Sequence, residues 1–481
     1  MSSTGLIRRR TSTSSDLIKR FIRKVLRLDG DREPALIPVA QHGITRDRLS
    51  HGARRTCEQL NDSGFQAYVV GGAVRDLLLG VTPKDFDVAT NATPDEVHRA
   101  IRRSRLIGRR FKIVHALFGE EVVEVSTFRA GQAAETDEHG RVLRDNVFGT
   151  REQDAARRDF TVNALYYDPA TESVLDFHKG VADLRKRTIR MIGDPPTRYR
   201  EDPIRMLRAV RFAAKLDFKI ETKTRAPIGA LAPLLENVPA ARVFDEMQKL
   251  LLSGHASVCV PRLRSEGLHH GLLPLLDVIA EQPLGEKFVN LALEQTDRRI
   301  REERGVSPAF LFAALLWHEV LSAWKTHQAN GERSLPALHV AMDEVIERQT
   351  DKLAIPRRFS TNMKEIWALQ PRFDGRSGRR PFALLEQPRF RAGFDFVVLR
   401  AASGEVPQEL ADWWEKFQIA SPTEQEAMLI DERTVTADSA IKRKRRRKRS
   451  VKIVVSASDN GDDDLTADTV HADDFTPSSK S

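Results

Sequence analysis

Apolar residues in the first two hundred positions follow two different spacings. Short β-rich or alternating runs predict strands at residues 66–70, 86–89, 122–128, 160–167 and 174–177. Apolar residues at helical spacing predict helices at 45–63 and 73–79, and a glycine ends each of them. Together these elements predict an α/β module that ends near Pro195–Pro196.

From Tyr199 to about Gln418 the apolar spacing is helical, with no convincing strand. Arg242–Leu252 and Ala309–Leu321 are examples, with apolar residues every three or four positions. The chain therefore predicts an α+β fold in which a mixed head precedes an all-helical remainder. Asp16–Leu28 also has helical spacing, with basic residues between the apolar ones. We expect this segment to pack on the protein or a partner, with the membrane surface as the alternative.

Length and charge narrow the class of protein. The 481 residues exceed what one hydrophobic core usually serves, so several domains are expected. The net charge of +9 favours a polyanionic partner, although many basic proteins bind no nucleic acid. Two cysteines, Cys57 and Cys259, exclude a disulfide framework and a thiolate zinc cluster. With no apolar run that could span a bilayer and no secretory signal, a cytoplasmic location is expected.

The two ends of the chain are unlike the middle. Residues 1–40 form a basic arm, and the last fifty residues turn from basic to acidic and Ser/Thr/Asp-rich. We expect the N-terminal arm to be partly disordered. Neither part of the C-terminal end can bury a core, so disorder is predicted there. Eight consecutive basic residues are predicted to bind RNA phosphates as an auxiliary tether: Lys442, Arg443, Lys444, Arg445, Arg446, Arg447, Lys448 and Arg449.

The first candidate for chemistry is a strand that runs into two glycines, Gly71 and Gly72, and then a helix. Such a turn exposes backbone N–H groups at a helix N-terminus, which suits an anion. Arg75, one turn into the helix, could add a contact to phosphate. An ordinary tight turn explains the glycines equally well when they are considered alone.

Carboxylates provide the second candidate. Asp85 and Asp87 are two residues apart in a predicted strand, so they share a face while Phe86 turns to the core. Adjacent carboxylates repel each other unless a cation lies between them, and hard cations such as Mg²⁺ bind such oxygens. Glu124 points away from Val123 and Val125 in another strand and could be a third carboxylate, or a surface glutamate.

A third cluster lies between residues 152 and 163. If this stretch were helical, Glu152 and Asp159 would share one face, while Arg157 and Arg158 could clamp a triphosphate beside Asn163. Solvated salt bridges are the alternative, and for Asp154, within the same stretch, we expect them.

A fourth cluster opens a helix. Asp202 followed by Pro203 predicts an N-cap and a first-turn proline. Arg205, Arg208 and Arg211 then recur every three residues along one side. A carboxylate and guanidiniums could read the edge of a base. The plainer interpretation is a capping aspartate with arginines that contact RNA or solvent.

These motifs, in this order, resemble the class II nucleotidyltransferases of the polymerase β superfamily. The segments that carry the resemblance are Gly71–Asp76, Asp85–Asp87, Arg157–Thr161 and Glu201–Arg205. That group contains tRNA CCA-adding enzymes and bacterial poly(A) polymerases.

Further segments resemble the poly(A) polymerase I branch: Leu106–His115, Val306–Ala313, Leu353–Arg357 and Trp413–Trp414. The similarity extends from about Gln41 to Met428. It implies a small polymerase-β-like head with a mixed sheet and helices, followed by an all-helical neck, body and tail. The implied divisions are an arm (1–40), a head (41–196), a nucleotide- and RNA-binding neck (197–270), an RNA-binding body and tail (271–430), and a disordered tail (431–481).

The resemblance also implies roles for the candidate residues. Asp85 and Asp87 would bind Mg²⁺, with Mn²⁺ as an alternative. Glu124 matches a third carboxylate, and Glu152 and Asp159 are rivals for an acidic catalytic role. The residues expected to bind the nucleotide ATP are Gly71, Gly72, Arg75, Arg158, Asn163, Asp202, Arg205, Arg208 and Arg211.

The implied activity is template-independent addition of AMP from ATP to RNA 3′ ends, with release of pyrophosphate, in RNA processing and turnover. CCA addition to tRNA is the runner-up, and a catalytically inactive RNA-binding protein is the third possibility. Expected partners are RNA, and RNA-degradation or RNA-chaperone proteins. We expect a monomer without membrane insertion, with peripheral membrane association through the N-terminal arm as an option.

Overall fold

The computed structural model describes residues 33–108, 112–130, 147–268, 283–350 and 353–430. The basic run 442–449 and the helix expected at 16–28 lie outside these ranges. Contacts divide the chain into two compact units, the first containing residues up to Ala368 with Val398–Val406, and the second Leu369–Val397 with the residues from Pro407 onward.

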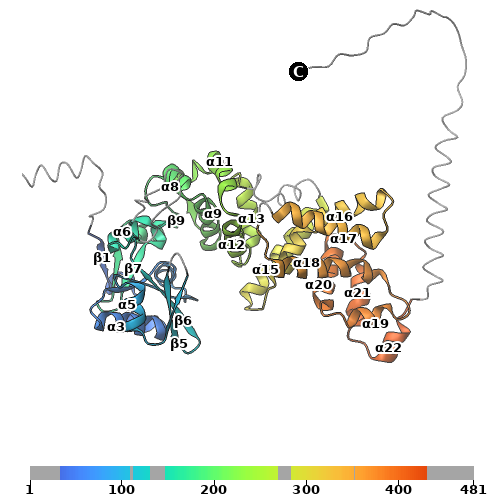
Figure 1. Cartoon of the computed structure of the whole chain (residues 1–481), viewed down its shortest axis with the longest axis horizontal. Coiled ribbons are helices and arrows are strands. Elements are labelled where there is room, and N and C mark those ends of the chain that lie inside the picture. Colours follow the sequence, from blue (N-terminus) through green and yellow to red (C-terminus); the bar gives the residue numbers. More distant parts are fainter. Residues whose placement is uncertain (1–32, 109–111, 131–146, 269–282, 351–352, 431–481) are drawn as a thin grey trace, which may run out of the picture. The chain divides into compact units, whose positions relative to one another are not determined.

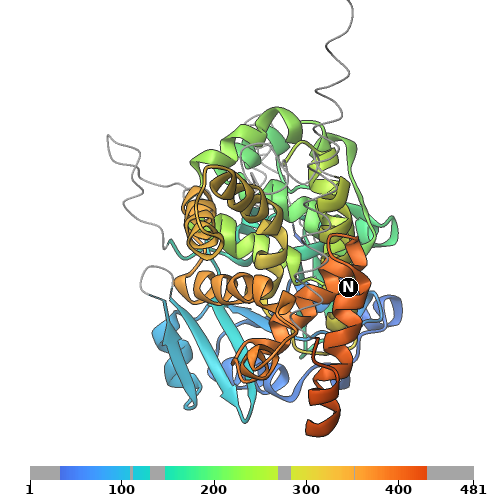
Figure 2. The same cartoon turned by 90° about the vertical axis from the view of Figure 1, so that its right-hand side faces the viewer.

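An eight-stranded mixed sheet forms the head (Figure 1). The strand order is β1-β8-β7-β2-β3-β6-β5-β4, and every neighbouring pair is antiparallel except β3 and β6. The strands are β1 (Ala35–Pro38), β2 (Ala67–Val70), β3 (Asp87–Thr90), β4 (Ser104–Ile107), β5 (Ile113–Phe118), β6 (Glu121–Thr127), β7 (Leu165–Asp168) and β8 (Ser173–Asp176). Figure 2 shows the twist of the sheet, with the strands near residues 104–127 in cyan.

Helices of the head pack against this sheet. They are α2 (Val39–His42), α3 (His51–Asp62), α4 (Gly72–Leu78), α5 (Pro94–Ala100), α6 (Arg151–Arg157) and α7 (Gly180–Arg185), with 3-10 turns η2 (Arg46–Arg48) and η3 (Thr161–Asn163). The Ser50 side chain caps α3 by accepting the Ala53 N–H. The core between helices and sheet includes the buried rings of Tyr68, Phe128 and Tyr166.

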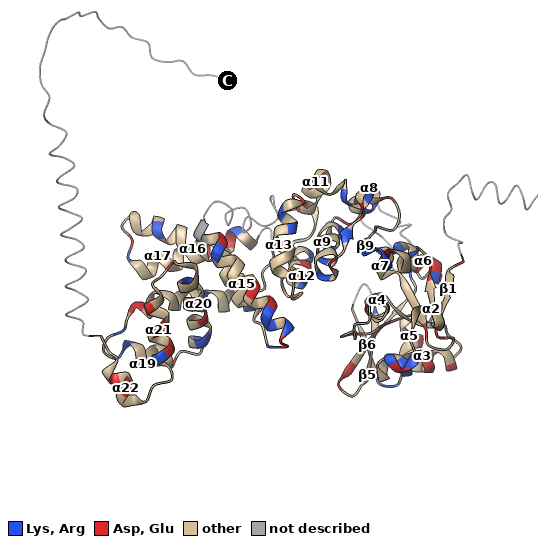
Figure 3. Cartoon of the chain, turned by 180° about the vertical axis from the view of Figure 1, so that it is seen from behind, with Lys and Arg blue, Asp and Glu red and all other residues tan. Residues whose placement is uncertain are grey.

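A helical region follows the head. Its elements are α8 (Pro195–Glu201), α9 (Ile204–Leu216), α10 (Thr222–Arg225), α11 (Ile228–Leu231), η4 (Ala232–Asn237), α12 (Ala240–Leu251) and α13 (Ala256–Ser265). Figure 3 shows basic positions along α8 and α9 in blue. The prediction of no strand beyond Tyr199 is wrong at one place, because β10 (Lys219–Ile220) pairs with β9 (Thr188–Ile189). A two-residue strand leaves no periodic signal in a sequence.

The first unit ends with α15 (Pro283–Arg301), α16 (Pro308–Ala329), α17 (Ser334–Thr350) and α18 (Arg357–Leu369), which runs one residue past its boundary. The second unit contains η5 (Gln370–Asp374), α19 (Arg380–Leu385), α21 (Gln408–Phe417) and α22 (Pro422–Ala427), and α20 (Phe390–Ser403) contributes to both units. In the second unit the buried Trp414 donates its indole N–H to the Phe373 carbonyl at 2.8 Å. No helix in the described ranges has the length and apolar composition needed to cross a bilayer.

The structure confirms the α+β fold and most predicted elements. Strands predicted at 66–70, 86–89, 122–128 and 174–177 lie within two residues of β2, β3, β6 and β8. The strand predicted at 160–167 is wrong in its first half, because η3 occupies Thr161–Asn163 and β7 begins only at Leu165. Strands β4 and β5 were not predicted. Strand β1 lies inside the range assigned to the N-terminal arm, because Ala35–Pro38 pairs with the distant β8.

Candidate active site

A glycine turn joins β2 to α4. Gly71 has a φ of +72°, which disfavours any residue with a side chain. A Cβ atom at this position would also lie 3.2 Å from Nη1 of Arg158. Arg75, in α4, is buried and donates to Asn163 Oδ1 at 2.7 Å and to Asp76 at 2.8 Å. The turn therefore brings backbone close to two arginines from different parts of the head.

Asp87 lies directly beside this turn, because β3 pairs with β2 in a register that places Asp87 opposite Val70. Asp85 and Asp87 are exposed and Phe86 between them is buried. The prediction that both aspartates lie in one strand is wrong for Asp85, because β3 begins at Asp87. The parallel partner β6 places Glu124 opposite Asp87, so both carboxylates project from the same face of the sheet. Desolvation within the cavity and the nearby charges of Glu124 and Asp85 raise the pKa of Asp87 to about 6, although Arg158 opposes the shift.

The next strand adds a residue that sequence reasoning missed. His115 of β5 pairs with Glu124, and its Nε2 lies 3.6 Å from the Glu124 carboxylate. Asp87, Glu124 and His115 thus stand in a row across three neighbouring strands. The signal was present in the alternating pattern of residues 113–118, which places His115 and Ile113 on one face and Val114 on the other.

Helix α6 ends at Arg157, so Glu152 and Asp159 do not share a helix face as predicted. Glu152 pairs with Arg151 at 3.0 Å, and Arg151 in turn donates to the Tyr68 hydroxyl. Glu152 does not line the cavity described below. The prediction for Asp154 is also wrong, because this residue is only 1% exposed and is not a partner in solvated salt bridges. It binds Arg157, Arg158 and Tyr166.

A partly buried ion pair connects the head to α9. Arg208 contacts the Asp159 carboxylate with Nε at 2.8 Å and with Nη2 at 2.6 Å. Asn163 adds a hydrogen bond to Asp159 at 3.3 Å. Burial alone would raise the pKa of Asp159, but Arg208 and its other donors hold it below the ordinary value. Asp159 therefore remains ionised, with its charge already matched by a cation.

The charged residues of α9 do not all face one way. Asp202 caps no helix with its side chain, contrary to prediction, and instead accepts from Arg242 of α12 at 3.0 and 3.1 Å. Arg205 donates to the Arg198 carbonyl at 2.9 Å and to Glu201 at 3.1 Å. Arg211 turns toward the buried Glu246, with Nε 2.6 Å from its carboxylate. A three-residue repeat drifts around a helix of 3.6 residues per turn, so its last member leaves the shared face.

These elements enclose a cavity of about 470 Å³. Its lining contains most of the predicted site residues, Arg157 among them, together with Phe212: Gly71, Gly72, Arg75, Asp87, Arg157, Arg158, Asp159, Asn163, Asp202, Arg205, Arg208 and Phe212. Asp85, Glu124, Glu152 and Arg211 are not in the lining. Phe212 was not predicted, although it lies four residues after Arg208 and therefore on the same helix face. Guanidiniums of Arg75 and Arg208 stand 5.5 and 5.4 Å from its ring.

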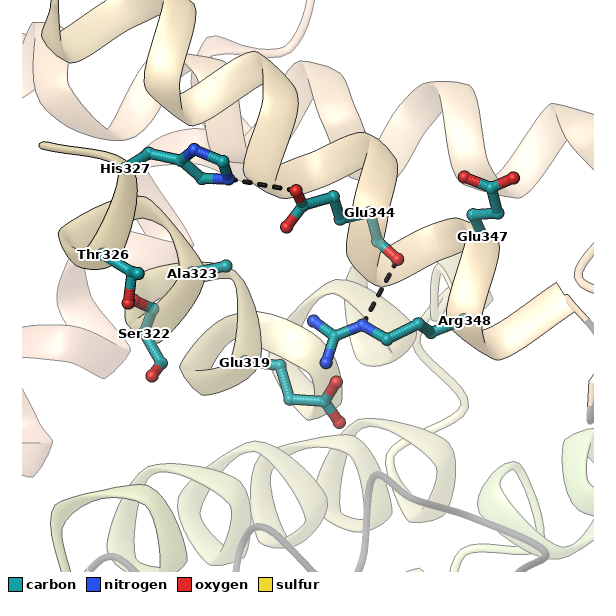
Figure 4. A pocket seen from close by; sticks show the side chains of 8 residues that line it. All are labelled: Glu319, Ser322, Ala323, Thr326, His327, Glu344, Glu347 and Arg348. Atoms are coloured by element: carbon teal, nitrogen blue, oxygen red, sulfur yellow. Dashed lines mark hydrogen bonds and ion pairs between the residues drawn. The ribbon is translucent and has the colours of Figure 1, made fainter. Parts of the chain in front are cut away.

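A larger cavity, about 740 Å³, lies between α16 and α17 (Figure 4). His327 in its wall is held by Glu332 at 2.7 Å and Glu344 at 3.1 Å, and Arg348 donates to the Glu344 carbonyl. None of the residues predicted to bind nucleotide lines it, and it contains no glycine turn. The smaller cavity is therefore the candidate active site, because it combines exposed backbone, a carboxylate and several guanidiniums.

The carboxylates at the cavity fit a hard divalent cation. Asp87 in the lining and Asp85, two residues earlier and outside the lining, offer oxygen donors. Desolvation is the main cause of the raised pKa of Asp87, and the negative charges of Glu124 and Asp85 add to it. No group of three or more His, Cys, Asp or Glu side chains in the described ranges is arranged as a complete metal cage. A cation such as Mg²⁺, which keeps waters and substrate phosphates as ligands, does not require one.

Replacing Asp87 by asparagine should stabilise the metal-free protein at pH 8, with an increase in Tm of roughly 1–3 °C. Because the folded-state pKa is raised to about 6 from an unfolded value of 3.8, ionisation of Asp87 opposes folding above pH 6. The advantage of the variant should therefore shrink as the pH falls from 6 toward 4. Thermal unfolding in EDTA at several pH values measures this, and a variant that is less stable at pH 8 would contradict it.

Comparisons with known proteins find similarity over most of the chain. Family models match residues 67–190 (poly A polymerase head domain), 217–279 (probable RNA and SrmB-binding site of polymerase A) and 330–451 (polymerase A arginine-rich C-terminus). Poly(A) polymerase I of Salmonella typhi is 44% identical over 454 residues, which is 90% of this chain and 97% of that protein.

Similarity to CCA-adding enzymes is more limited in sequence. The CCA-adding enzyme of Enterococcus faecalis is 38% identical over 236 residues, 47% of this chain and 57% of that protein. The crystal structure of the Bacillus stearothermophilus CCA-adding enzyme in complex with CTP has a TM-score of 0.50 at 27% identity. It covers 76% of this chain and 81% of the other.

Proposed function

Because the chain belongs to the bacterial poly(A) polymerase I family, we propose that it extends RNA 3′ ends by transferring AMP from ATP without a template. It is a polynucleotide adenylyltransferase. The observation that carries the proposal is one cavity in which the glycine turn, Asp87 and Arg158 converge with Asp202, just before α9, and Arg205 of α9. A nucleoside triphosphate needs these three environments together: a cation site, guanidiniums and a polar edge for the base.

We propose that the head binds the triphosphate and the cations, while residues at the start of α9 contact the base. Arg157 and Arg158 face the triphosphate, and the glycine turn leaves room for it. Asp85 and Asp87 would hold divalent cations. Two such cations, when bound, would lower the pKa of the RNA 3′-hydroxyl and neutralise the charge of the leaving pyrophosphate. Asp202 and Arg205 would contact the adenine edge.

In the reaction the 3′-oxygen forms a bond to the α-phosphorus of ATP, and the bond from that phosphorus to the β-phosphate-bearing oxygen breaks. The hydroxyl proton passes to solvent, and pyrophosphate leaves with the electron pair of the broken bond. No covalent bond to the protein forms, so the residues of the cavity act by positioning and by charge stabilisation. The cavity's guanidiniums supply positive charge where the pyrophosphate develops negative charge.

Of the three rivals for the third carboxylate, we propose Glu124. It stands opposite Asp87 on the parallel strand, and its charge contributes to the raised pKa of Asp87. Asp159 is neutralised by Arg208, and Glu152 is bound to Arg151. Neither Glu124 nor Glu152 lines the cavity, so the choice rests on the pairing of Glu124 with Asp87. His115 contacts Glu124 and would restrict its orientation.

CCA addition is the second candidate within the same chemistry. The poly(A) polymerase relative aligns over 90% of this chain and the CCA-adding enzyme over 47%, which favours polyadenylation. The test is to incubate the protein with a generic RNA, with tRNA, and with each nucleoside triphosphate separately. We expect a long ladder with ATP alone on either RNA. Extension that stops after C-C-A, and on tRNA only, would reject the proposal.

Several features remain predictions from the sequence. These are the five-part division of the chain, the role in RNA turnover, the preference for Mg²⁺, the RNA tether at 442–449, accessory RNA-degradation partners and the monomeric state.

A further inference from the structure

Asp154 of α6 is the buried centre of a cluster of charged groups beside the candidate active site. Its Oδ1 accepts from Nε of Arg157 at 2.8 Å, and its Oδ2 accepts from Nη2 of Arg158 at 3.1 Å. The Tyr166 hydroxyl of β7 donates to Oδ2 at 2.6 Å. The side chain of Asp154 is 1% exposed and does not line the cavity, whereas both arginines do.

Charge explains why this carboxylate is present. Two guanidiniums on consecutive residues repel each other, and the flexible side chains would otherwise separate into solvent. Arg157 donates from Nε and Nη2 to Oδ1 of Asp154, and Arg158 donates from Nε and Nη2 to Oδ2. A single carboxylate therefore fixes the orientation of both planar guanidiniums. Burial alone would raise the pKa of Asp154, but Arg158, Arg157 and Tyr166 hold it below its ordinary value. The carboxylate therefore stays ionised throughout the neutral range.

Tyr166 completes the arrangement from the sheet. Its hydroxyl accepts from Nε of Arg158 at 3.1 Å, and the guanidinium stands 5.1 Å from the ring centre. Nη1 of Arg158 donates to the Asn163 carbonyl at 3.3 Å, close to the glycine turn. Nη1 of Arg157 has no hydrogen-bond partner among the described residues, so it can donate to a ligand.

We propose that Asp154, supported by Tyr166, is a positioning residue that aligns Arg157 and Arg158 for the triphosphate of ATP and for the leaving pyrophosphate. This inference rests on the proposed function, since it assigns the triphosphate to the same cavity. Asp154 itself touches no substrate. Because Asp154 already orders both arginines in the free protein, less conformational entropy is lost when the nucleotide binds.

The test measures the affinity of the full-length protein for ATP and for inorganic pyrophosphate, by calorimetry, in Asp154→Asn. The NH₂ group of asparagine is a donor and cannot accept from a guanidinium. At least one of the two arginines would therefore lose the hydrogen bonds that hold its position. We expect binding of both ligands to weaken about 10- to 100-fold. In RNA extension the KM for ATP should increase by a similar factor, with a smaller change in kcat.

Asp183 of α7 provides a matched control. It is 5% exposed, and it accepts from Arg190 at 3.0 Å and from Thr161 at 2.8 Å, but it does not line the cavity. Asp183→Asn should lower Tm comparably and leave both affinities unchanged. Equal loss of affinity in the two variants would overturn the proposal, because the effect would then be one of general stability.

Two further measurements keep the test decisive. If Asp154→Asn does not fold, Tyr166→Phe removes a single hydroxyl and should weaken pyrophosphate binding about 3-fold. When Arg157→Ala and Arg158→Ala are both already present, adding Asp154→Asn should weaken binding no further, because the two side chains that Asp154 positions are gone. Additive losses, or unchanged pyrophosphate binding in both single variants, would reject the role of Asp154. Wild-type protein that binds ATP but extends no RNA would count against the proposed function only.

Discussion

Replacing Asp85 and Asp87 together by asparagine should lower kcat for AMP transfer at least about a thousand-fold. The two carboxylates occupy exposed positions on either side of the buried Phe86, and Asp87 lines the cavity beside the glycine turn. Asparagine keeps the shape and removes both charges. A divalent cation would then lose its protein ligands, and the triphosphate would lose the charge that offsets its own.

Primer extension with radiolabelled ATP over a range of Mg²⁺ and Mn²⁺ concentrations measures the effect. The control is Glu152→Gln, since Glu152 pairs with Arg151 and lies outside the cavity lining. It should retain activity within about 3-fold, whereas Glu124→Gln should lose most of it. Rapid extension by the doubly substituted protein would remove the mechanism proposed for this family member. Loss in Glu152→Gln that matches the loss in Glu124→Gln would return the third carboxylate to an open question.

Replacing Asp202 by asparagine should lower kcat/KM for ATP about 10- to 100-fold and reduce discrimination between ATP and CTP. Asp202 lines the cavity from the segment between α8 and α9, and Arg242 holds its carboxylate from α12. A carboxylate accepts hydrogen bonds from the amino edge of a base, whereas the amide also donates. The change therefore alters the recognition pattern while it leaves the triphosphate contacts in place.

Single-nucleotide incorporation with ATP and CTP gives the selectivity ratio. Asp217→Asn is a suitable control. Asp217 ends α9 in the left-handed conformation, which asparagine tolerates, and its side chain is 83% exposed. This control should preserve both rates. If Asp202→Asn keeps the wild-type preference for ATP, base recognition must come from other groups in the cavity.

Local pattern alone predicted the parts of the site that depend on neighbouring residues. The alternation at Lys84–Val88 predicted that Asp85 and Asp87 are exposed on either side of a buried Phe86, and the glycine pair after a strand predicted the turn. Helical spacing beyond Tyr199 predicted α9 with its arginines. These features follow from the periods of strands and helices, which a sequence displays directly.

Only the tertiary structure decided which of these residues meet. The parallel pairing of β3 with β6 places Glu124 opposite Asp87, and the antiparallel pairing of β5 adds His115. The end of α6 at Arg157 separates Glu152 from the site, and burial converts Asp154 from an expected surface residue into an anchor for two arginines. Strand register, helix ends and burial depend on contacts between distant segments. The sequence therefore shows which side chains are charged, but it does not show which residues they pair with.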